Sequence, residues 1–175
     1  MKTVVRHFDR LAGELVAKLP PRFHGGLAAL SDIVSPISWA VVMLVGSLIA
    51  QEWGNTSLVV LSAFALLALP LAELIKMVVR RPRPISIYVE NMRMRSYSFP
   101  SGHSYTASLG AIYLIVYLTQ YISGPWLWST SGIILAVTLA VALSRVYLKA
   151  HFPSDVVAGL LLGLIVAIAL VCLVM

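Results

Sequence analysis

Long apolar runs constrain the fold of this chain more than any other feature of its sequence. Five stretches, at about residues 33–50, 58–79, 104–121, 127–147 and 155–175, are apolar over the length that a membrane span requires, which is about 20 residues. The runs do not alternate apolar and polar residues, which argues against membrane strands. Only 11% of the residues are charged, against roughly a quarter in a soluble domain. We therefore expect an all-α, polytopic transmembrane helical bundle with about five spanning helices.

The segment before the first run has a different pattern. Between Val4 and Leu19, apolar residues recur at helical spacing opposite a charged face, and Pro20-Pro21 ends the pattern. This is typical of an amphipathic helix at a membrane interface, although a helix packed on the end of the bundle fits equally well. We expect no cleavable signal peptide, because residues 1–24 contain no apolar core. The chain divides into residues 1–24, the N-terminal amphipathic interfacial segment, and residues 25–175, the transmembrane domain.

Positive charge is confined to one side of the expected bundle. If five helices alternate in direction, all 13 Lys and Arg residues fall on or near the face of the N-terminal segment and the 80–100 and 146–154 loops. The connections on the opposite face contain none. Lys and Arg in short loops tend to remain cytoplasmic, so the pattern predicts that this face is cytoplasmic.

The same face collects cations that suit a phosphate group. The second span ends in KMVVRRPRP, the third follows PSGH, and the fourth ends in SRVYLKAHFPSD. Lys76, Arg83 and Arg145 could surround a dianion, because Arg offers paired N–H donors and Lys a point charge. Ser101 and Gly102 precede an expected helix, whose first N–H groups attract anions. The pattern predicts an anion site.

Two histidines and a carboxylate complete this set. One of His103 and His151 could attack phosphorus while the other protonates the leaving oxygen. Asp155 follows His151 by four residues, and a carboxylate beside a histidine fixes its tautomer and stabilises the imidazolium. Cations and helix dipoles support phosphoryl transfer by electrostatics alone. The set therefore indicates phosphoryl transfer without a metal ion.

In this order, the motifs K-x6-RP, PSGH and SR-x5-H-x3-D resemble the three signature motifs of the type-2 phosphatidic acid phosphatase family. Its superfamily includes vanadium haloperoxidases and bacterial acid phosphatases, and the resemblance covers residues 76–155 and the flanking spans. It implies a membrane-embedded phosphoric-ester hydrolase of bacterial type that needs no metal or other cofactor. The implied substrate is a lipid phosphomonoester or diphosphate: phosphatidic acid, phosphatidylglycerophosphate, a polyprenyl (di)phosphate or a lipid A phosphate.

The resemblance also implies a role for each motif residue. His151 would be the nucleophile that forms a phosphohistidine, Asp155 would orient it, and His103 would protonate the leaving alcohol and then help activate water. The implied phosphate ligands are Lys76, Arg83, Ser101, the Gly102 N–H and Arg145. The implied site-shaping residues are Pro84, Pro100 and Ser144.

Several further expectations follow from the resemblance. The protein would lie in a prokaryotic plasma (inner) membrane, with the bilayer and a lipid phosphate as partners and no nucleic acid, and its oligomeric state stays open. Family members usually have six spans, so a sixth is an alternative here. Bacterial members commonly place the site outside the cytoplasm, which conflicts with the charge pattern.

Other interpretations remain for parts of the sequence. The whole site could belong to a haloperoxidase-like enzyme or to a non-enzymatic protein that binds or transports anions or anionic lipids. A channel would need polar positions through the depth of several spans, whereas the ionisable residues lie at one face.

We expect five other cations to reach lipid headgroups, and the 85–99 loop to select the substrate. Those cations are Arg80, Arg81, Arg93, Arg95 and Lys149.

Overall fold

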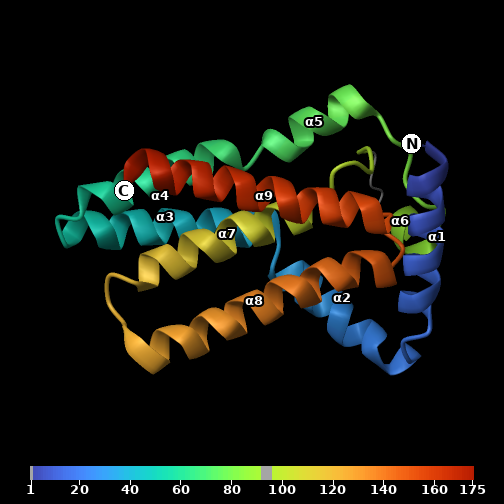
Figure 1. Cartoon of the computed structure of the whole chain (residues 1–175), viewed down its shortest axis with the longest axis horizontal. Helices are drawn as coiled ribbons and strands as arrows, with labels where there is room; N and C mark the ends of the chain where they lie inside the picture. Colours follow the sequence, from blue (N-terminus) through green and yellow to red (C-terminus); the bar gives the residue numbers. More distant parts are fainter. Residues whose placement is uncertain (1, 92–95) are drawn as a thin grey trace.

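The computed structural model describes residues 2–91 and 96–175, and every regular element in them is a helix (Figure 1). The prediction of an all-α fold is confirmed. In chain order, the elements are α1 (Lys2–Ala17), η1 (Pro21–Phe23), α2 (His24–Ile33), α3 (Pro36–Glu52), α4 (Thr56–Ala68), α5 (Leu71–Val79), α6 (Ile87–Asn91), α7 (Gly102–Leu118), α8 (Gly124–Tyr147) and α9 (Pro153–Val174).

Three helical segments in the described part of the chain are long and apolar enough to cross a membrane. They are Thr56–Val79, which joins α4 and α5, and the helices α8 and α9. A fourth candidate joins Pro21–Ile33 to α3 across a bend of 43°. Helix α7, with 17 residues, runs among them. The chain is thus a helical membrane protein, while the count of five spans stays a prediction.

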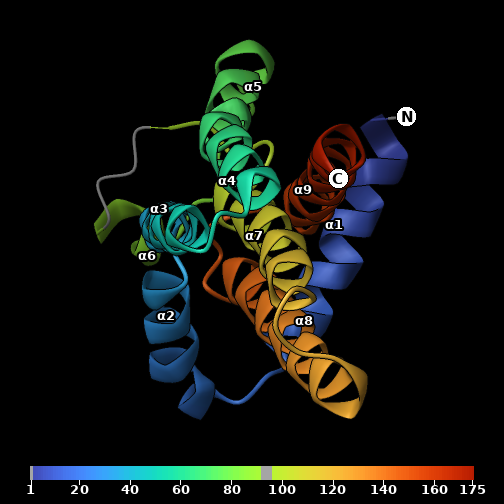
Figure 2. The same cartoon turned by 90° about the vertical axis from the view of Figure 1, so that its left-hand side faces the viewer.

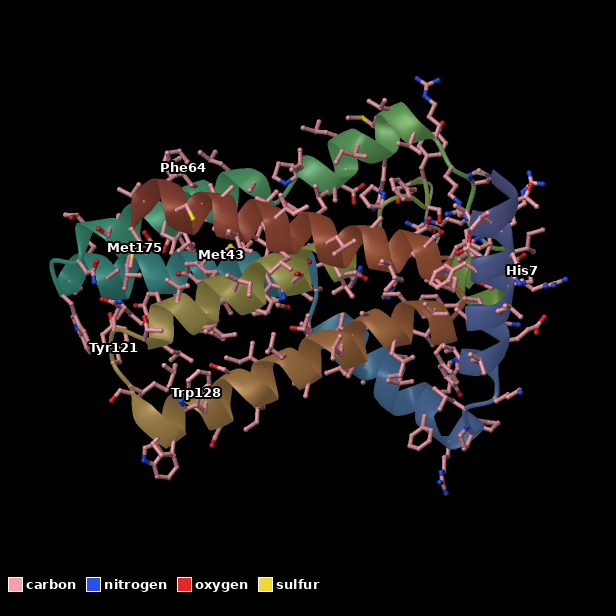
Figure 3. The ribbon with its side chains drawn as sticks, viewed as in Figure 1. His7, Met43, Phe64, Tyr121, Trp128 and Met175 are labelled. Carbon is pink, nitrogen blue, oxygen red and sulfur yellow. The ribbon has the colours of Figure 1, made fainter. Side chains whose placement is uncertain are left out.

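The outer surface of the bundle is apolar, as lipid contact requires. In Figure 3, Phe64 and Trp128 lie on the outside of the bundle, and Trp128 is 78% exposed. Met43 lies inside the bundle and is fully buried. The apolar exterior agrees with lipid as the solvent of most of this surface.

Helices α7 and α9 pack closely along their length. A Cβ added to Gly159 of α9 would lie 2.6 Å from the carbonyl oxygen of Ser101, and one added to Gly163 would overlap that of Tyr105. Only glycine permits so close an approach of two backbones. The small-residue spacing of α9 therefore serves packing within the chain, and it fixes the start of α7 against the start of α9.

Helix α1 lies across one end of the bundle, roughly perpendicular to the long helices (Figures 1 and 2). It packs against α8 and α9. Val4, Phe8, Leu11 and Leu15 remain exposed on it. Helix α1 is thus packed on the end of the bundle. Contact of its exposed apolar residues with the membrane interface, and the division of the chain at residue 24, remain predictions.

Candidate active site

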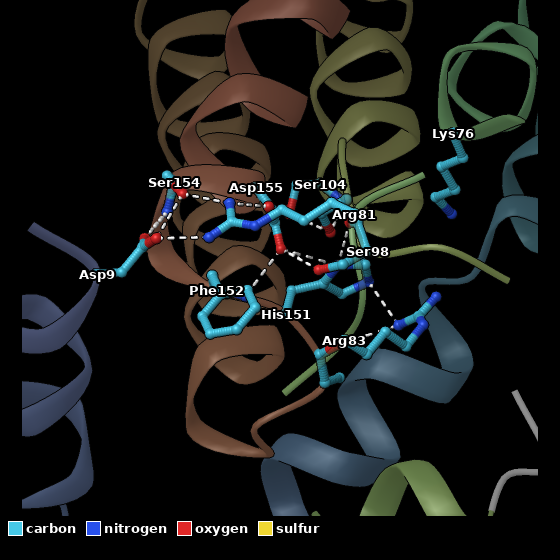
Figure 4. A network of polar contacts seen from close by, with 12 residues as sticks. Asp9, Lys76, Arg81, Arg83, Ser98, Ser104, His151, Phe152, Ser154 and Asp155 are labelled. Atoms are coloured by element: carbon cyan, nitrogen blue, oxygen red, sulfur yellow. Dashed lines mark hydrogen bonds and ion pairs between the residues drawn. The ribbon is translucent and has the colours of Figure 1, made fainter. Parts of the chain in front are cut away.

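The motif residues come from three separate helix ends and meet at the end of the bundle that α1 covers (Figure 4). Lys76 lies in the last turn of α5, and a Cβ added to Gly102 at the start of α7 would be 3.2 Å from its Nζ. Arg83 follows α5 and donates from Nη1 to the carbonyl oxygen of Ala150 at 3.0 Å. Arg83 Nη1 also lies 3.1 Å from His151 Nε2. The expected juxtaposition of the three motifs is therefore present.

The hydrogen bonds of His151 determine its tautomer. Its Nδ1 lies 2.8 Å from the carbonyl oxygen of Ser98. A carbonyl oxygen only accepts, so Nδ1 carries the proton and Nε2 presents a lone pair. Arg83, which only donates, faces that lone pair. His151 thus has a neutral imidazole whose Nε2 lone pair faces the guanidinium of Arg83.

Asp155 does not bond His151 directly, which differs from the expected orienting contact. The nearest carboxylate oxygen lies 3.8 Å from His151 Nδ1. Asp155 Oδ2 instead accepts from the backbone N–H of Phe152 at 2.9 Å and from the hydroxyl of Ser98. The reason is its place in the first turn of α9, where a carboxylate bonds the free N–H groups of the helix start. Ser98 therefore connects Asp155 to His151.

Burial and charge both keep His151 neutral. Burial lowers the pKa of His151 to about 4, and the charges of Arg83, Arg145 and Lys76 act in the same direction. Only Asp155, close by, opposes this effect. Burial, and then the charge of Arg145, also lower the pKa of Arg83. Such crowding of cations favours a bound anion of more than one charge.

Arg145 is fully buried in the last turn of α8. Its Nη1 donates to Ser31 Oγ at 2.5 Å and to Tyr88 OH at 3.3 Å. Its Nε and Nη2 have no hydrogen-bond partner among the described residues. A buried donor without a partner costs about 1–3 kcal/mol, more if charged. The free edge of this guanidinium is thus a strong indication of an anion site.

The start of α7 offers further donors. Ser101 is the N-cap, and its Oγ accepts from Ser104 N at 3.4 Å and from Ser104 Oγ at 3.0 Å, so its own hydroxyl hydrogen is free to donate. Ser101 N is used by Asp155 O at 3.0 Å. The first N–H groups of a helix lack intrahelical partners, which leaves those of Gly102 and His103 for an anion. The His103 side chain lies within electrostatic range of His151 and Arg145.

The three residues expected to shape the site differ in what they contact. Pro100 is buried beside the N-cap of α7, and Pro84 lines a small cavity with His151. Ser144 is buried, but its hydroxyl donates to Val141 O at 2.6 Å within its own helix. Ser144 thus shapes the end of α8 and offers no donor to the site.

Three residues without an assigned role in the motifs lie next to them in the structure. Ser98 was not assigned a role, although it lies two residues before PSGH. Arg81, expected at lipid headgroups, bonds Asp155 at 2.6 Å and Asp9 at 2.7 Å. The charge pattern did not single out Asp9, because residues 1–24 contain a second acidic residue, Glu14. Arg93 and Arg95 lie outside the described residues, as does part of the loop expected to select the substrate.

Comparison with known proteins agrees with this geometry. A sequence model of the PAP2 superfamily matches residues 56–175, which is more than half of the chain. The chain belongs to the PAP2 superfamily. All three motifs fall within the matched region, so the resemblance seen in the motifs is confirmed.

Two curated relatives of this chain are named as phosphatases of polyprenyl lipids. An undecaprenyl-diphosphatase of Sulfolobus acidocaldarius is 40% identical over 101 residues, 55% of this chain and 45% of that protein. A decaprenylphosphoryl-5-phosphoribose phosphatase of Mycobacterium tuberculosis is 32% identical over 137 residues, 73% of this chain and 66% of that protein. The chain thus spans between about half and two thirds of the length of these relatives.

Solved PAP2 structures share the fold. A transmembrane PAP2-type phosphatidylglycerolphosphate phosphatase from Bacillus subtilis aligns over 97% of this chain and 86% of its own, with a TM-score of 0.71 and 22% identity. LpxE of Aquifex aeolicus aligns over 92% and 93%, with a TM-score of 0.64 and 17% identity. At these identities the likeness establishes the architecture of a membrane PAP2 protein.

Proposed function

We propose that this chain is a membrane-embedded, metal-independent phosphatase that hydrolyses a lipid phosphomonoester or diphosphate through a phosphohistidine. The observation that carries the proposal is that one site combines the lone pair of a histidine nitrogen with buried hydrogen-bond donors that lack partners among the described residues. His151 Nε2 faces Arg83, while buried Arg145 has two nitrogens without a partner among the described residues. A phosphate group satisfies these donors and places phosphorus before the nucleophile.

In the first half-reaction, His151 Nε2 forms a bond to phosphorus as the bond from phosphorus to the lipid oxygen breaks. His103 in its protonated imidazolium form gives a proton to that oxygen and becomes neutral, so the product leaves as an alcohol or, from a diphosphate, as a lipid monophosphate. Lys76, Arg83 and Arg145, with Ser101 and the Gly102 N–H, stabilise the charge on the phosphoryl oxygens. The phosphorylated imidazole keeps its Nδ1–H bond to the Ser98 carbonyl.

In the second half-reaction, a water attacks phosphorus on the phosphohistidine. His103 accepts its proton, the bond between phosphorus and Nε2 breaks, and inorganic phosphate leaves with His151 neutral again. The phosphorylated imidazole carries positive charge, and the Asp155 carboxylate 3.8 Å from Nδ1 stabilises it electrostatically. Asp155 thus acts on His151 in two ways, by its negative charge and by the hydrogen bond that it accepts from Ser98.

The substrate class follows from the place of the site and from the relatives. The site lies at one end of an apolar bundle, so a lipid presents its phosphate without leaving the bilayer. The Sulfolobus and mycobacterial relatives are both named for polyprenyl lipids. This supports a polyprenyl phosphate or diphosphate ahead of a glycerophospholipid.

The membrane is proposed to be a prokaryotic plasma membrane, with the site on its cytoplasmic side. Four of the 13 Lys and Arg residues belong to the site or its ion pairs, namely Lys76, Arg81, Arg83 and Arg145. With five alternating helices, the sequence positions of the other nine still predict the same face. Bacterial family members commonly have the opposite arrangement, so orientation needs its own test.

The test of function is phosphate release by the purified protein with EDTA present, across a panel of polyprenyl phosphate, polyprenyl diphosphate, phosphatidic acid, phosphatidylglycerophosphate and lipid A phosphate. We expect activity on a polyprenyl lipid that survives chelation and disappears in His151→Ala. Lys149→Gln, which removes an exposed cation near the nucleophile, serves as the matched control. Lipid binding without phosphate release would instead support the non-enzymatic alternative, and an active His151→Ala protein would reject the nucleophile.

A further inference from the structure

An acidic residue of α1, outside all three motifs, is bonded into the site. Asp9 is buried and accepts from Arg81 Nη2 at 2.7 Å (Figure 4). It also accepts from Ser154 N at 2.8 Å and from Ser154 Oγ at 3.0 Å. Asp9 therefore bonds both a cation of the α5–α6 connection and the first turn of α9.

From Asp9, a continuous path of hydrogen bonds leads to the nucleophile. Arg81 bonds Asp9 through Nη2, and through Nη1 it bonds Asp155 Oδ1 at 2.6 Å. Asp155 Oδ2 accepts from the Ser98 hydroxyl, and the Ser98 carbonyl accepts from His151 Nδ1. Ser98 N donates to Arg81 O at 2.8 Å, which closes the path through the main chain.

The position of the Arg81 guanidinium is determined from several sides. It bonds two carboxylates and Ser154 Oγ, and it stacks over the Phe152 ring with 4.3 Å from Cζ to the centroid. A planar guanidinium can bridge two carboxylates in a way that a lysine ammonium cannot. If Asp9 lost its charge, Arg81 would keep Asp155, Ser154 and the Phe152 ring but lose the carboxylate that holds Nη2.

We propose that Asp9 and Arg81 are positioning residues for the nucleophile, so that α1 is part of the catalytic apparatus. Asp9 holds Arg81, Arg81 holds Asp155, and Ser98 passes that orientation to the Nδ1–H of His151. Neither residue touches the phosphate, and both act through Asp155. The inference rests on the proposed phosphatase function and assigns a catalytic purpose to the N-terminal helix.

The experiment compares Asp9→Asn with Glu14→Gln in the full-length, detergent-purified protein. Both variants remove one negative charge from α1, but Glu14 is exposed and outside the network. For Asp9→Asn we expect kcat to fall about tenfold or more, with KM within about twofold, because the phosphate ligands are unchanged. Glu14→Gln should keep both constants. A wild-type kcat in Asp9→Asn would overturn the proposal.

A second measurement separates positioning from general stability. Arg81→Lys breaks the path at its centre, so adding Asp9→Asn to it should lower kcat by less than about threefold more. An additional loss as large as that caused by Asp9→Asn alone would show that Asp9 acts independently of Arg81 and would overturn the proposal.

A third readout does not depend on turnover. In ¹⁵N-histidine spectra of Asp9→Asn, the His151 signal should show a mixture of tautomers in place of Nδ1–H alone. An unchanged signal would reject the path from Asp9 to His151. If the wild type showed no phosphatase activity, the proposed function would fail while this spectroscopic test still reported on the path.

Discussion

The direction of one N–H bond decides whether His151 can act as a nucleophile. The Ser98 carbonyl takes the Nδ1 proton, so Nε2 presents its lone pair toward Arg83. The opposite tautomer would present an N–H group to phosphorus and could not attack it. At the scale of single residues, a main-chain oxygen therefore has the orienting role that is usually sought in a carboxylate.

We predict that His151 stays neutral well below neutral pH. Burial lowers the pKa of His151 to about 4, below the value of about 6.5 for a free histidine. Its imidazole should thus remain uncharged from pH 7 down to 5 and gain a proton only as the pH approaches 4. ¹⁵N chemical shifts of labelled histidine, assigned by loss of the signal in His151→Ala, would measure this. A transition between pH 6 and 7 would contradict it.

Arg145→Lys should lower kcat/KM by about 100-fold, because lysine cannot offer a planar set of donors to two phosphate oxygens. The fully buried arginine is held by Ser31 and Tyr88 through Nη1 alone. Steady-state kinetics of Arg145→Lys beside Lys149→Gln would measure this loss, with little change expected in the control. Equal activity of the two variants would show that Arg145 does not bind the phosphate.

At the scale of elements, the contact between α7 and α9 sets the geometry of the site. Ser101 N donates to Asp155 O, so the start of α7 is bonded to the first turn of α9. Gly159 lies one turn further along and permits this closeness. Packing in the membrane interior and chemistry at its surface are thus coupled through one helix pair.

Gly159→Ala should therefore impair both stability and activity. The new Cβ would lie 2.6 Å from Ser101 O, so α7 and α9 must separate. Overpacking of this kind costs about 1–3 kcal/mol, and we expect a lower melting temperature in detergent together with a reduced kcat. Gly132→Ala on α8 is the control, since nothing lies within 4 Å of its added Cβ. Identical melting curves for the two variants would show that the contact is not tight.

Sequence patterns were informative at this scale where a single physical rule applied. Apolar runs predicted helices, and motif spacing placed Lys76, Arg83 and His151 at one end. The patterns could not show that Asp155 bonds Ser98 and Arg81. Those bonds depend on how the helices pack, which the spacing of residues along the chain does not determine. The position of α1 was also undetermined, because an amphipathic face can bury itself against lipid or against protein.

At the scale of the whole molecule, the two ends of the bundle differ. Helix α1 lies at one end of the bundle and the C-terminus at the other (Figure 1). Lys76, Arg81 and Arg83 lie at the end that α1 covers (Figure 4). The basic end is where the phosphate headgroup of a lipid would meet the protein. One end of the bundle thus combines membrane-surface charge with the chemistry.

Orientation in the membrane can be tested at Met175, at the end opposite the site. Because Lys and Arg are retained on the cytoplasmic side, a fused alkaline phosphatase at Met175 should be active and a fused fluorescent protein dark. The same two reporters placed before Lys2 should give the reverse pattern. A fluorescent C-terminal fusion would place the site outside the cytoplasm and reject the orientation inferred from charge.

The bonds between Asp9 and Ser154 join residues 145 positions apart, which has a consequence for biogenesis. A ribosome adds residues from the N-terminus onward, so α1 emerges long before its partners in α9 exist. Asp9 can pair with Arg81 once residue 81 has been made, but its bonds to Ser154 form only after nearly the whole bundle has been inserted. A chain stopped before Ser154 would carry most of the phosphate ligands without the contact that completes the site, and a nascent membrane protein would therefore be inert until its last helix is made.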